Sequence, residues 1–223
     1  MADRGRVIAL ASGGPDSAAL LLYLSRRFSR VIPVYIRAGL IWEREELPAM
    51  RRFLRAAGLP RVAHPVVVSL PSTDLYRGHW SITRRHVPGA KSADKAVYLP
   101  GRNLLLFSKA AVLAPGLKAG TIAIGTLKGN PFRDATSRFR SIMSRAVSCA
   151  MDADIRIIAP FEKLAKRDLM KMAAGLPLHL TFSCIKPVRG MHCGRCNKCA
   201  ERIGAFRMAG IRDGTGYYFR TGR

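Results

Sequence analysis

The chain has 223 residues, 48% of them hydrophobic, so it can bury one good core but has no room for a second full domain. It holds 38 lysines and arginines against 14 aspartates and glutamates, which gives a formal net charge of +24. No apolar run is long enough to cross a bilayer, and the first residues lead into a strand pattern without the apolar stretch of a signal peptide. We therefore expect a cytoplasmic protein with no membrane contact.

The positive charge has two interpretations that the sequence leaves open. A field of this size favours phosphate backbones without regard to base sequence, which is typical of nucleic-acid binding. The basic residues, however, are spread over nearly every segment and form no block longer than a dipeptide such as Arg26-Arg27. That spread is also typical of a soluble surface of which only a few arginines meet phosphates. At most, we expect weak, nonspecific binding of nucleic acid.

Strand and helix patterns alternate along the chain. Apolar runs rich in β-branched residues predict strands at residues 7–11, 31–36, 65–70, 121–124 and 155–158. Helical patterns occur at residues 17–28, 43–57, 103–113, 137–150 and 166–174. The alternation predicts an α/β fold with a doubly wound, Rossmann-like parallel sheet that binds ligands at the carboxyl ends of its strands. Residues 71–97 are polar and aperiodic, and we interpret them as a mobile segment over the site.

The first predicted strand runs directly into Ser12-Gly13-Gly14-Pro15-Asp16-Ser17, and a helical pattern follows. Glycines 13 and 14 permit positive φ angles and a close approach of the backbone to a ligand, while the first amides of a helix point outward unpaired. The expected guest is a phosphate or a pyrophosphate. Asp16 and Ser17 are also typical of a plain helix N-cap pair. The Gly-Lys-Ser/Thr and Gly-x-Gly-x-x-Gly patterns of other nucleotide loops are absent.

Ser-Gly-Gly-x-Asp-Ser after a first strand resembles the signature of the PP-loop ATP pyrophosphatases. The resemblance implies a Rossmann-like domain of the adenine nucleotide alpha hydrolase type that cleaves ATP between the α and β phosphates to adenylate a substrate. It leaves the acceptor open, because members of this group act on many acceptors.

The cysteines form the second strong signal, with the spacing Cys184-x8-Cys193-x2-Cys196-x2-Cys199. Structural zinc takes four soft ligands in a tetrahedron, and two-residue spacings let a backbone knuckle aim adjacent thiolates at one ion. Two alternatives stay open: disulfides, which the absence of an export signal disfavours, and an iron-sulfur cluster, which also takes four thiolates.

Three residues near or outside this pattern are given no role. His179 and His192 flank the cluster, and we interpret them as bystanders because four cysteines already fill a closed zinc site. Cys149 lies in an apolar helical pattern and is expected to be a core residue.

Taken together, the motifs resemble the 7-cyano-7-deazaguanine (preQ0) synthase family over nearly the whole chain. The matching elements are the PP-loop, Pro100-Gly101-Arg102-Asn103, Lys166-Arg167-Asp168 after Pro160, Thr181-Phe182-Ser183-Cys184 and Cys193-Gly-x-Cys196-x-x-Cys199. The resemblance implies a zinc-binding, ATP-dependent ligase that adenylates 7-carboxy-7-deazaguanine, makes the amide with ammonia, and dehydrates the amide to the nitrile with a second ATP.

The resemblance also implies residue roles. Ser12, Gly13, Gly14, Asp16 and Ser17 would hold the pyrophosphate, with Asp16, Ser17 and Lys166 as catalytic residues. Arg102 and Asn103 would line the nucleotide or base pocket, and Lys166 would meet phosphates or the acyl adenylate. Lys166 alone is equally typical of a solvated lysine at a helix start. We expect ATP, Mg²⁺ and Zn²⁺ as cofactors, a small-molecule carboxylate and ammonia as substrates, and a homodimer. The expected parts are an ATP-binding domain at residues 1–175 and a zinc-binding C-terminal appendage at 176–223.

Two segments depart from the family pattern. Where the family carries an acidic run ending in Pro-Asp-Cys-Arg, this chain has Lys128 and Arg133, which we expect in the wall of the substrate site. Residues 36–43 read Ile-Arg-Ala-Gly-Leu-Ile-Trp-Glu where the family tends to show Asp-Tyr-Gly-Gln. Both changes fall on the substrate side while the ATP side is intact, which indicates a divergent family member. Its substrate is then either the usual deazapurine acid or a different, related carboxylate, and conjugation of a deazapurine-like acid to another acceptor stays open as an alternative.

Two other functions compete with a ligase. A PP-loop enzyme that modifies tRNA is favoured by the +24 charge, but four of five cysteines are assigned to a metal rather than to sulfur transfer. A nonenzymatic zinc protein with a degenerate loop is disfavoured because the loop is complete.

Overall fold

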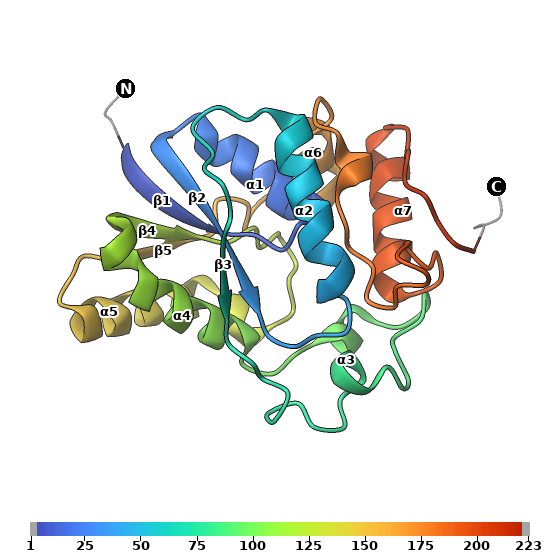
Figure 1. The fold of residues 1–223 in the computed structure, drawn as a ribbon, viewed down its shortest axis with the longest axis horizontal. Helices are drawn as coiled ribbons and strands as arrows, with labels where there is room; N and C mark the ends of the chain where they lie inside the picture. The colour runs from blue at the N-terminus through green and yellow to red at the C-terminus, as the bar shows by residue number, and fades with distance from the viewer. Residues whose placement is uncertain (1–3, 220–223) are drawn as a thin grey trace.

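The computed structural model describes residues 4–219. Its centre is a five-stranded sheet in the order β3-β2-β1-β4-β5, and every neighbouring pair is parallel (Figure 1). The strands are β1 (Arg4–Leu10), β2 (Phe28–Arg37), β3 (Val66–Ser69), β4 (Ala119–Ala123) and β5 (Arg156–Ile158). The predicted Rossmann-like α/β class is confirmed.

Helices cover both faces of the sheet because the strands are apolar on both sides. Alternate residues of β1 divide between two cores: Val7 and Ala9 face one, and Ile8 and Leu10 face the other. The first core takes in α1 (Pro15–Ser25), α6 (Lys166–Met172) and α7 (Asn197–Ala209), and α2 (Glu43–Ala57) packs beside them. The second core takes in α4 (Arg102–Leu117) and α5 (Ser137–Met151).

The five predicted strands and five predicted helices all occur, with shifted ends. The first helix ends at Ser25 rather than at residue 28, because Phe28 is already buried as the first residue of β2. The sequence reading missed α7, whose N-terminal end is occupied by the cysteine pattern, and the short α3 (Trp80–Thr83). Three 3₁₀ turns complete the elements: η1 (Asp94–Val97), η2 (Arg133–Ala135) and η3 (Leu178–Leu180).

The segment before α4, interpreted from sequence as a mobile loop, packs against the cysteine region. The backbone N–H of Asn197 donates to the oxygen of Pro88 at 3.0 Å, and the Asn197 side chain donates to Ser92 at 2.8 Å. Trp80 stacks on Trp42 with ring centres 5.7 Å apart. The segment therefore forms a packed wall beside the carboxyl ends of the strands.

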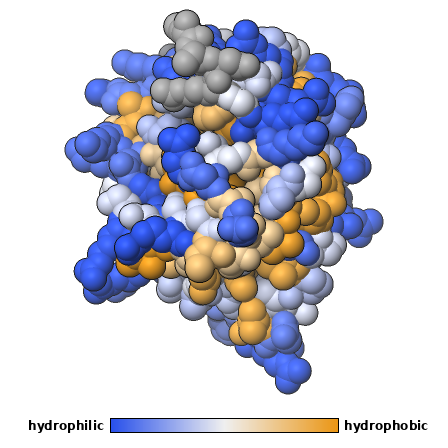
Figure 2. Space-filling view, turned by 90° about the vertical axis from the view of Figure 1, so that its left-hand side faces the viewer, coloured by the Kyte–Doolittle hydropathy of each residue, from blue (hydrophilic) through white to orange (hydrophobic). Residues whose placement is uncertain are grey.

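The C-terminal part shares its core with the N-terminal helices. Ala205 and Phe206 of α7 belong to the same apolar cluster as Leu20 and Leu24 of α1. The division at residue 175 stays a prediction. Within residues 4–219, no helix is both long and apolar enough to span a bilayer. On the face nearest β1, Figure 2 shows hydrophilic side chains around most of the outline and an apolar area toward the middle.

Candidate active site and metal centre

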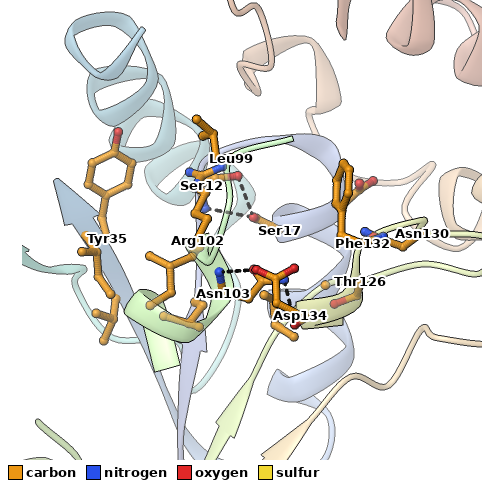
Figure 3. Close-up of a pocket in the computed structure, with 18 of the residues that line it drawn as sticks. Ser12, Ser17, Tyr35, Leu99, Arg102, Asn103, Thr126, Asn130, Phe132 and Asp134 are labelled. Atoms are coloured by element: carbon orange, nitrogen blue, oxygen red, sulfur yellow. Dashed lines mark hydrogen bonds between the residues drawn. The ribbon is translucent and has the colours of Figure 1, made fainter. Parts of the chain in front are cut away.

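The Ser-Gly-Gly-x-Asp-Ser loop connects β1 to α1 and is closed by its two serines. The backbone N–H of Ser12 donates to Ser17 Oγ at 3.0 Å, and the two hydroxyls lie 3.2 Å apart (Figure 3). The N-cap of α1 is Gly14, and no side chain caps the helix. The interpretation of Asp16 and Ser17 as a plain N-cap pair is therefore wrong. The first amides of α1 remain free to meet an anion, at the positive end of the helix dipole.

The two loop glycines have different reasons to be glycine. Gly13 has a φ of +83°, and a Cβ there would lie 3.0 Å from Met50 Cβ and 3.1 Å from the backbone oxygen of Glu46. Gly14 has a φ of −77°, and a Cβ there would meet its neighbours at an ordinary 3.6 Å. The prediction of positive φ is confirmed for Gly13 and wrong for Gly14. Gly13 is needed because the loop packs directly on α2.

A chain of charges joins the loop to α6 and α7. Lys166 Nζ lies 2.7 and 2.9 Å from the two Asp16 oxygens and 2.9 Å from Glu201 Oε1. Lys198 Nζ lies 2.6 Å from Glu201 Oε2. Burial opposes the charge of Lys166, but the Asp16 and Glu201 carboxylates outweigh it and raise the Lys166 pKa. Burial also opposes the charge of Glu201, and the two lysines lower its pKa to about 2. Lys166 and Glu201 are thus both charged at neutral pH.

The larger of the two main cavities at this edge of the sheet has a volume of about 270 Å³. It lies among the carboxyl ends of β1, β2 and β4 and the start of α4 (Figure 3). One side carries Tyr98 and Phe132, stacked with ring centres 4.7 Å apart. Asn103 and Asp134 fix each other, because the Asn103 backbone N–H donates to the Asp134 carboxylate at 2.9 Å and its amide donates to the Asp134 backbone oxygen at 3.1 Å. Buried Thr126 Oγ1 has no partner among the described residues.

Glu46 and Arg102 also line this cavity. Tyr35 donates its hydroxyl to Glu46 Oε2 at 2.8 Å, and Glu46 is 7% exposed. Burial raises the Glu46 pKa to about 8, although Arg102 and the Tyr35 hydroxyl act in the opposite direction. Buried Arg102 Nε has no hydrogen-bond partner within residues 4–219. Unpaired buried groups of this kind are costly unless a ligand completes them.

A second cavity, of about 180 Å³, extends from the loop toward the cysteines. The start of α1 and the cationic side chains of Lys166, Lys198 and Arg202 line it. Four residues line both cavities: Ser12, Asp16, Glu46 and Arg102. The two spaces therefore meet at the PP-loop. The first has aromatic and acidic walls, and the second carries the carboxylates of Asp16, Glu46 and Glu201 beside its cationic side chains.

The prediction that basic side chains form a wall of the substrate site is wrong. Lys128 and Arg133 are exposed, and neither lines a cavity. The turn that follows Gly129, held by the Phe132 N–H donating to Asn130 Oδ1 at 3.0 Å, directs Asn130, Phe132 and Asp134 inward. A buried carboxylate, Asp134, is thus present in this wall. Which residues face the cavity depends on the turn, and residue order alone does not show it.

The second departure, at the end of β2, has a structural account. Glu43 accepts the backbone N–H of Ala38 at 2.7 Å and of Gly39 at 3.3 Å, so it fixes the loop between β2 and α2. Glu46 and Tyr35 were missed by the sequence reading. The available signal was a carboxylate among Leu47, Met50 and Phe53 on the buried face of α2.

The four predicted cysteines form a compact cluster. Their Sγ atoms all lie within 4.8 Å of one another, with Cys184 to Cys196 and Cys193 to Cys199 both at 3.8 Å. Tetrahedral zinc, with Zn–S bonds of about 2.3 Å, places its sulfurs about 3.8 Å apart. Backbone N–H groups point at Cys184 Sγ from Lys186 and Cys193, both at 3.3 Å, and would support thiolate charge. The donor set fits one zinc ion.

The alternatives for the cysteines fit less well. All five cysteines are free thiols, and sulfurs 3.8 Å apart are not bonded. Four sulfurs this close leave room for a single ion rather than for a cluster of several irons. His192 is outside the group of ligands and accepts the Ser183 N–H at 3.2 Å. The expectation that Cys149 is a core residue is wrong, because it is exposed on α5.

Comparisons with known proteins agree with these motifs. A family model described as queuosine biosynthesis protein QueC matches residues 6–210. The chain is 27% identical to a 7-cyano-7-deazaguanine synthase of Methanocaldococcus jannaschii, over 95% of this chain and 99% of that protein. It is 28% identical to a Sulfolobus acidocaldarius protein of the same name, over 96% of this chain and 48% of the relative, so it spans about half of that relative's length. A Nautilia profundicola relative of that name is 29% identical over 93% and 96% of the two chains.

One solved structure adds support for the fold alone. A crystal structure described as a predicted subunit of tRNA methyltransferase from Methanocaldococcus jannaschii superposes with a TM-score of 0.51. It is 16% identical in sequence and covers 76% of this chain and 74% of the other.

The two loop glycines give a matched test of the geometry. Gly13→Ala is expected to lower the free energy of unfolding by about 1 to 3 kcal/mol, because the new Cβ is strained at positive φ and meets α2. Gly14→Ala should cost less than about 1 kcal/mol, since only the N-cap preference changes. Urea unfolding measures both. Equal losses at the two positions would contradict the geometry described for the loop.

The cysteine cluster predicts about one zinc per chain with a structural role, because four thiolates leave no open position for water. Metal analysis should find that stoichiometry, and chelation should lower the melting temperature. Cys196→Ser should lower it as well, whereas Cys149→Ser, on the exposed face of α5, should leave it unchanged. Stoichiometric iron, or an unchanged melting temperature in Cys196→Ser, would show that the zinc assignment is wrong.

Proposed function

The chain belongs to the family of the queuosine biosynthesis protein QueC, and from that membership we propose that it is an ATP-dependent carbon-nitrogen ligase of the 7-cyano-7-deazaguanine synthase type. In the proposed reaction, a carboxylate oxygen of 7-carboxy-7-deazaguanine, or of a related acid, attacks the α-phosphorus of ATP, and pyrophosphate leaves. Ammonia then displaces AMP to give the amide. The amide oxygen then attacks the α-phosphorus of a second ATP, pyrophosphate leaves and the nitrogen loses one proton. Loss of AMP and of the second proton from nitrogen gives the nitrile.

The observation that supports this proposal best is the meeting of two unlike cavities at the PP-loop. The second cavity has the free start of α1 with Lys166 and Lys198, which suits the departing pyrophosphate. The larger cavity offers stacked aromatic rings and the Asp134 carboxylate, which suit a planar ring whose edge donates hydrogen bonds. A reacting carboxylate and an α-phosphorus could meet between them, beside Ser12, Asp16 and Arg102.

We assign two roles to metals. Mg²⁺ takes oxygen ligands, and Asp16, whose carboxylate opens into both cavities, is the residue we propose to hold it against the phosphates, where it would offset their charge. Zinc at the four cysteines would fix the Ser183–Cys184 segment and the start of α7. Because Glu201 and Lys198 lie on α7, the zinc ion would thereby also position the cavity wall that faces Lys166.

A second candidate, modification of a tRNA base, has one observation in its favour. On α2, four exposed arginines, Arg44, Arg51, Arg52 and Arg55, fall on one helical face, which suits contacts with several phosphates. This face lies outside both cavities. We therefore propose that it attracts nucleic acid only nonspecifically and that the acceptor is a small acid.

The ligase proposal predicts that ATP yields AMP and pyrophosphate when a suitable carboxylic acid is present. Ser17→Ala and Asp16→Asn should each lower turnover on the order of 10²-fold, because each changes a group at the phosphate cradle. Folding should be largely retained, since Lys166 keeps Glu201 as a partner in Asp16→Asn. The exposed variants Ser141→Ala and Asp154→Asn serve as matched controls and should keep full activity. Chromatography of the nucleotides is the measurement. ADP and orthophosphate as the only products would contradict the proposal.

The two acceptor classes differ in their response to salt. A small acid should stimulate AMP release with a log–log salt slope of roughly one or less, whereas tRNA should bind with a steep slope near its number of phosphate contacts and should leave AMP release unchanged. Replacing Arg51, Arg52 and Arg55 of α2 together by Gln should flatten the tRNA slope without changing turnover of the acid. If tRNA stimulates AMP release and no free acid does, tRNA modification replaces the ligase proposal.

A further inference from the structure

Glu46 occupies the junction of the two cavities. It is one of four residues that line both, and the other three are Ser12, Asp16 and Arg102. Its backbone packs against the PP-loop, because the Glu46 oxygen lies 3.1 Å from where a Gly13 Cβ would stand. A carboxyl group at this point would face the place where the acyl carbon and the α-phosphorus are proposed to meet.

The neighbouring carboxylates are already engaged. Asp16 and Glu201 are paired with Lys166. Glu43 accepts two backbone N–H groups, and Asp134 accepts the N–H of Asn103. At Glu46, Tyr35 holds Oε2 at 2.8 Å, and the hydrogen bonds among residues 4–219 leave Oε1 without a donor. Of the acidic side chains that line the cavities in this part of the chain, Glu46 and Asp134 each keep one carboxylate oxygen without a donor, and Glu46 is the one of the two that lines both cavities.

The groups that face Glu46 come from four elements. They are Tyr35 on β2, Arg102 on α4, Glu43 one turn earlier on α2, and Asp16 across the junction on α1. Burial and the Glu43 charge disfavour the carboxylate, while Arg102 and the Tyr35 hydroxyl favour it, and the resulting pKa is about 8. A carboxyl group with this pKa can take up and release a proton near neutral pH.

We propose that Glu46 is the proton acceptor of the ammonia-dependent step, an inference that rests on the ligase function proposed above. The nitrogen of ammonia forms a bond to the acyl carbon of the adenylate, and the bond from that carbon to the AMP oxygen breaks, with its electron pair leaving on AMP. The surplus proton on nitrogen passes to Glu46 Oε1. The Tyr35 hydroxyl is a positioning residue that holds the carboxyl in place through Oε2.

Glu46→Gln separates the two halves of the reaction. Adenylation needs no proton acceptor, so acid-dependent exchange of pyrophosphate into ATP, measured without ammonia, should stay within about 3-fold of the wild type. Amide formation from ammonia should fall on the order of 10² to 10⁴-fold, the range typical of lost general-base catalysis. Glu45→Gln is the matched control, because Glu45 is the preceding residue on α2 and lines neither cavity, and both rates should be unchanged.

The pH dependence adds a readout that a merely structural role would not give. The wild-type rate of amide formation, expressed per free ammonia, should rise with pH through about 8, where the carboxyl loses its proton. The residual rate of Glu46→Gln should be flat. Tyr35→Phe removes a hydrogen bond that favours the ionised form, so its profile should move to higher pH while the rate at high pH is retained.

A measurement of stability tests the buried carboxyl without any turnover. Between the ordinary pKa of 4.5 and the folded value of about 8, the folded protein keeps a proton that the unfolded chain has lost. The unfolding free energy of the wild type should therefore fall, relative to Glu46→Gln, as pH rises across this window. A difference that does not change with pH would overturn the proposal.

The remaining outcomes separate the two proposals. Absence of acid-dependent exchange in the wild type would overturn the ligase function and this inference with it. Normal exchange together with normal amide formation in Glu46→Gln would overturn the role of Glu46 alone. A raised KM for ATP in Glu46→Gln with unchanged rates would assign Glu46 to nucleotide binding and would also overturn the proposal.

Discussion

The ion-paired chain of Asp16, Lys166 and Glu201 is the contact on which the site depends. It joins the PP-loop to α6 and to α7, which begins in the cysteine cluster, so three segments far apart in the sequence meet in one set of charges. The Lys166 side chain is 17% exposed, and removing one partner of a buried pair leaves an uncompensated charge. Such a contact adds little net stability but fixes geometry. In the proposed reaction, a pyrophosphate would draw Lys166 away from Asp16 and leave that carboxylate for a magnesium ion.

The distribution of acidic residues tells against the basic surface as the substrate site. Of only 14 aspartates and glutamates, five line the two cavities: Asp16, Glu43, Glu46, Asp134 and Glu201. The phosphates of a nucleic acid would be repelled by these carboxylates, whereas a small molecule with hydrogen-bond donors on its ring could donate to them. The excess positive charge lies outside, on faces such as the arginines of α2. The basic outer surface would therefore attract anions in general, whereas the cavities would select a particular small molecule.

Much of the fold and part of the site could be predicted from the sequence. The strands follow from apolar β-branched runs, and the cluster of Cys184, Cys193, Cys196 and Cys199 follows from spacing, because both patterns are local. Arg102 and Asn103 could be placed at the cavity only because Pro100-Gly101-Arg102-Asn103 resembles an element of the family. Glu46 could not be assigned, since only the packing of α2 against β1 and β2 shows that its carboxyl faces a ligand space rather than the core. The prediction that Lys128 and Arg133 line the site was wrong for the opposite reason. Residue order placed them at the site, but the turn after Gly129 directs both side chains outward.

The central claim is that a carboxylate oxygen attacks the α-phosphorus of ATP where the two cavities meet. It can be tested with a candidate acid whose carboxylate carries a heavy oxygen isotope, incubated with ATP and ammonia, followed by mass spectrometry of the nucleotide. Attack by the carboxylate and later cleavage of the bond from the acyl carbon to that oxygen predict one labelled oxygen in AMP. AMP without label, formed at the same rate as amide, would contradict the account.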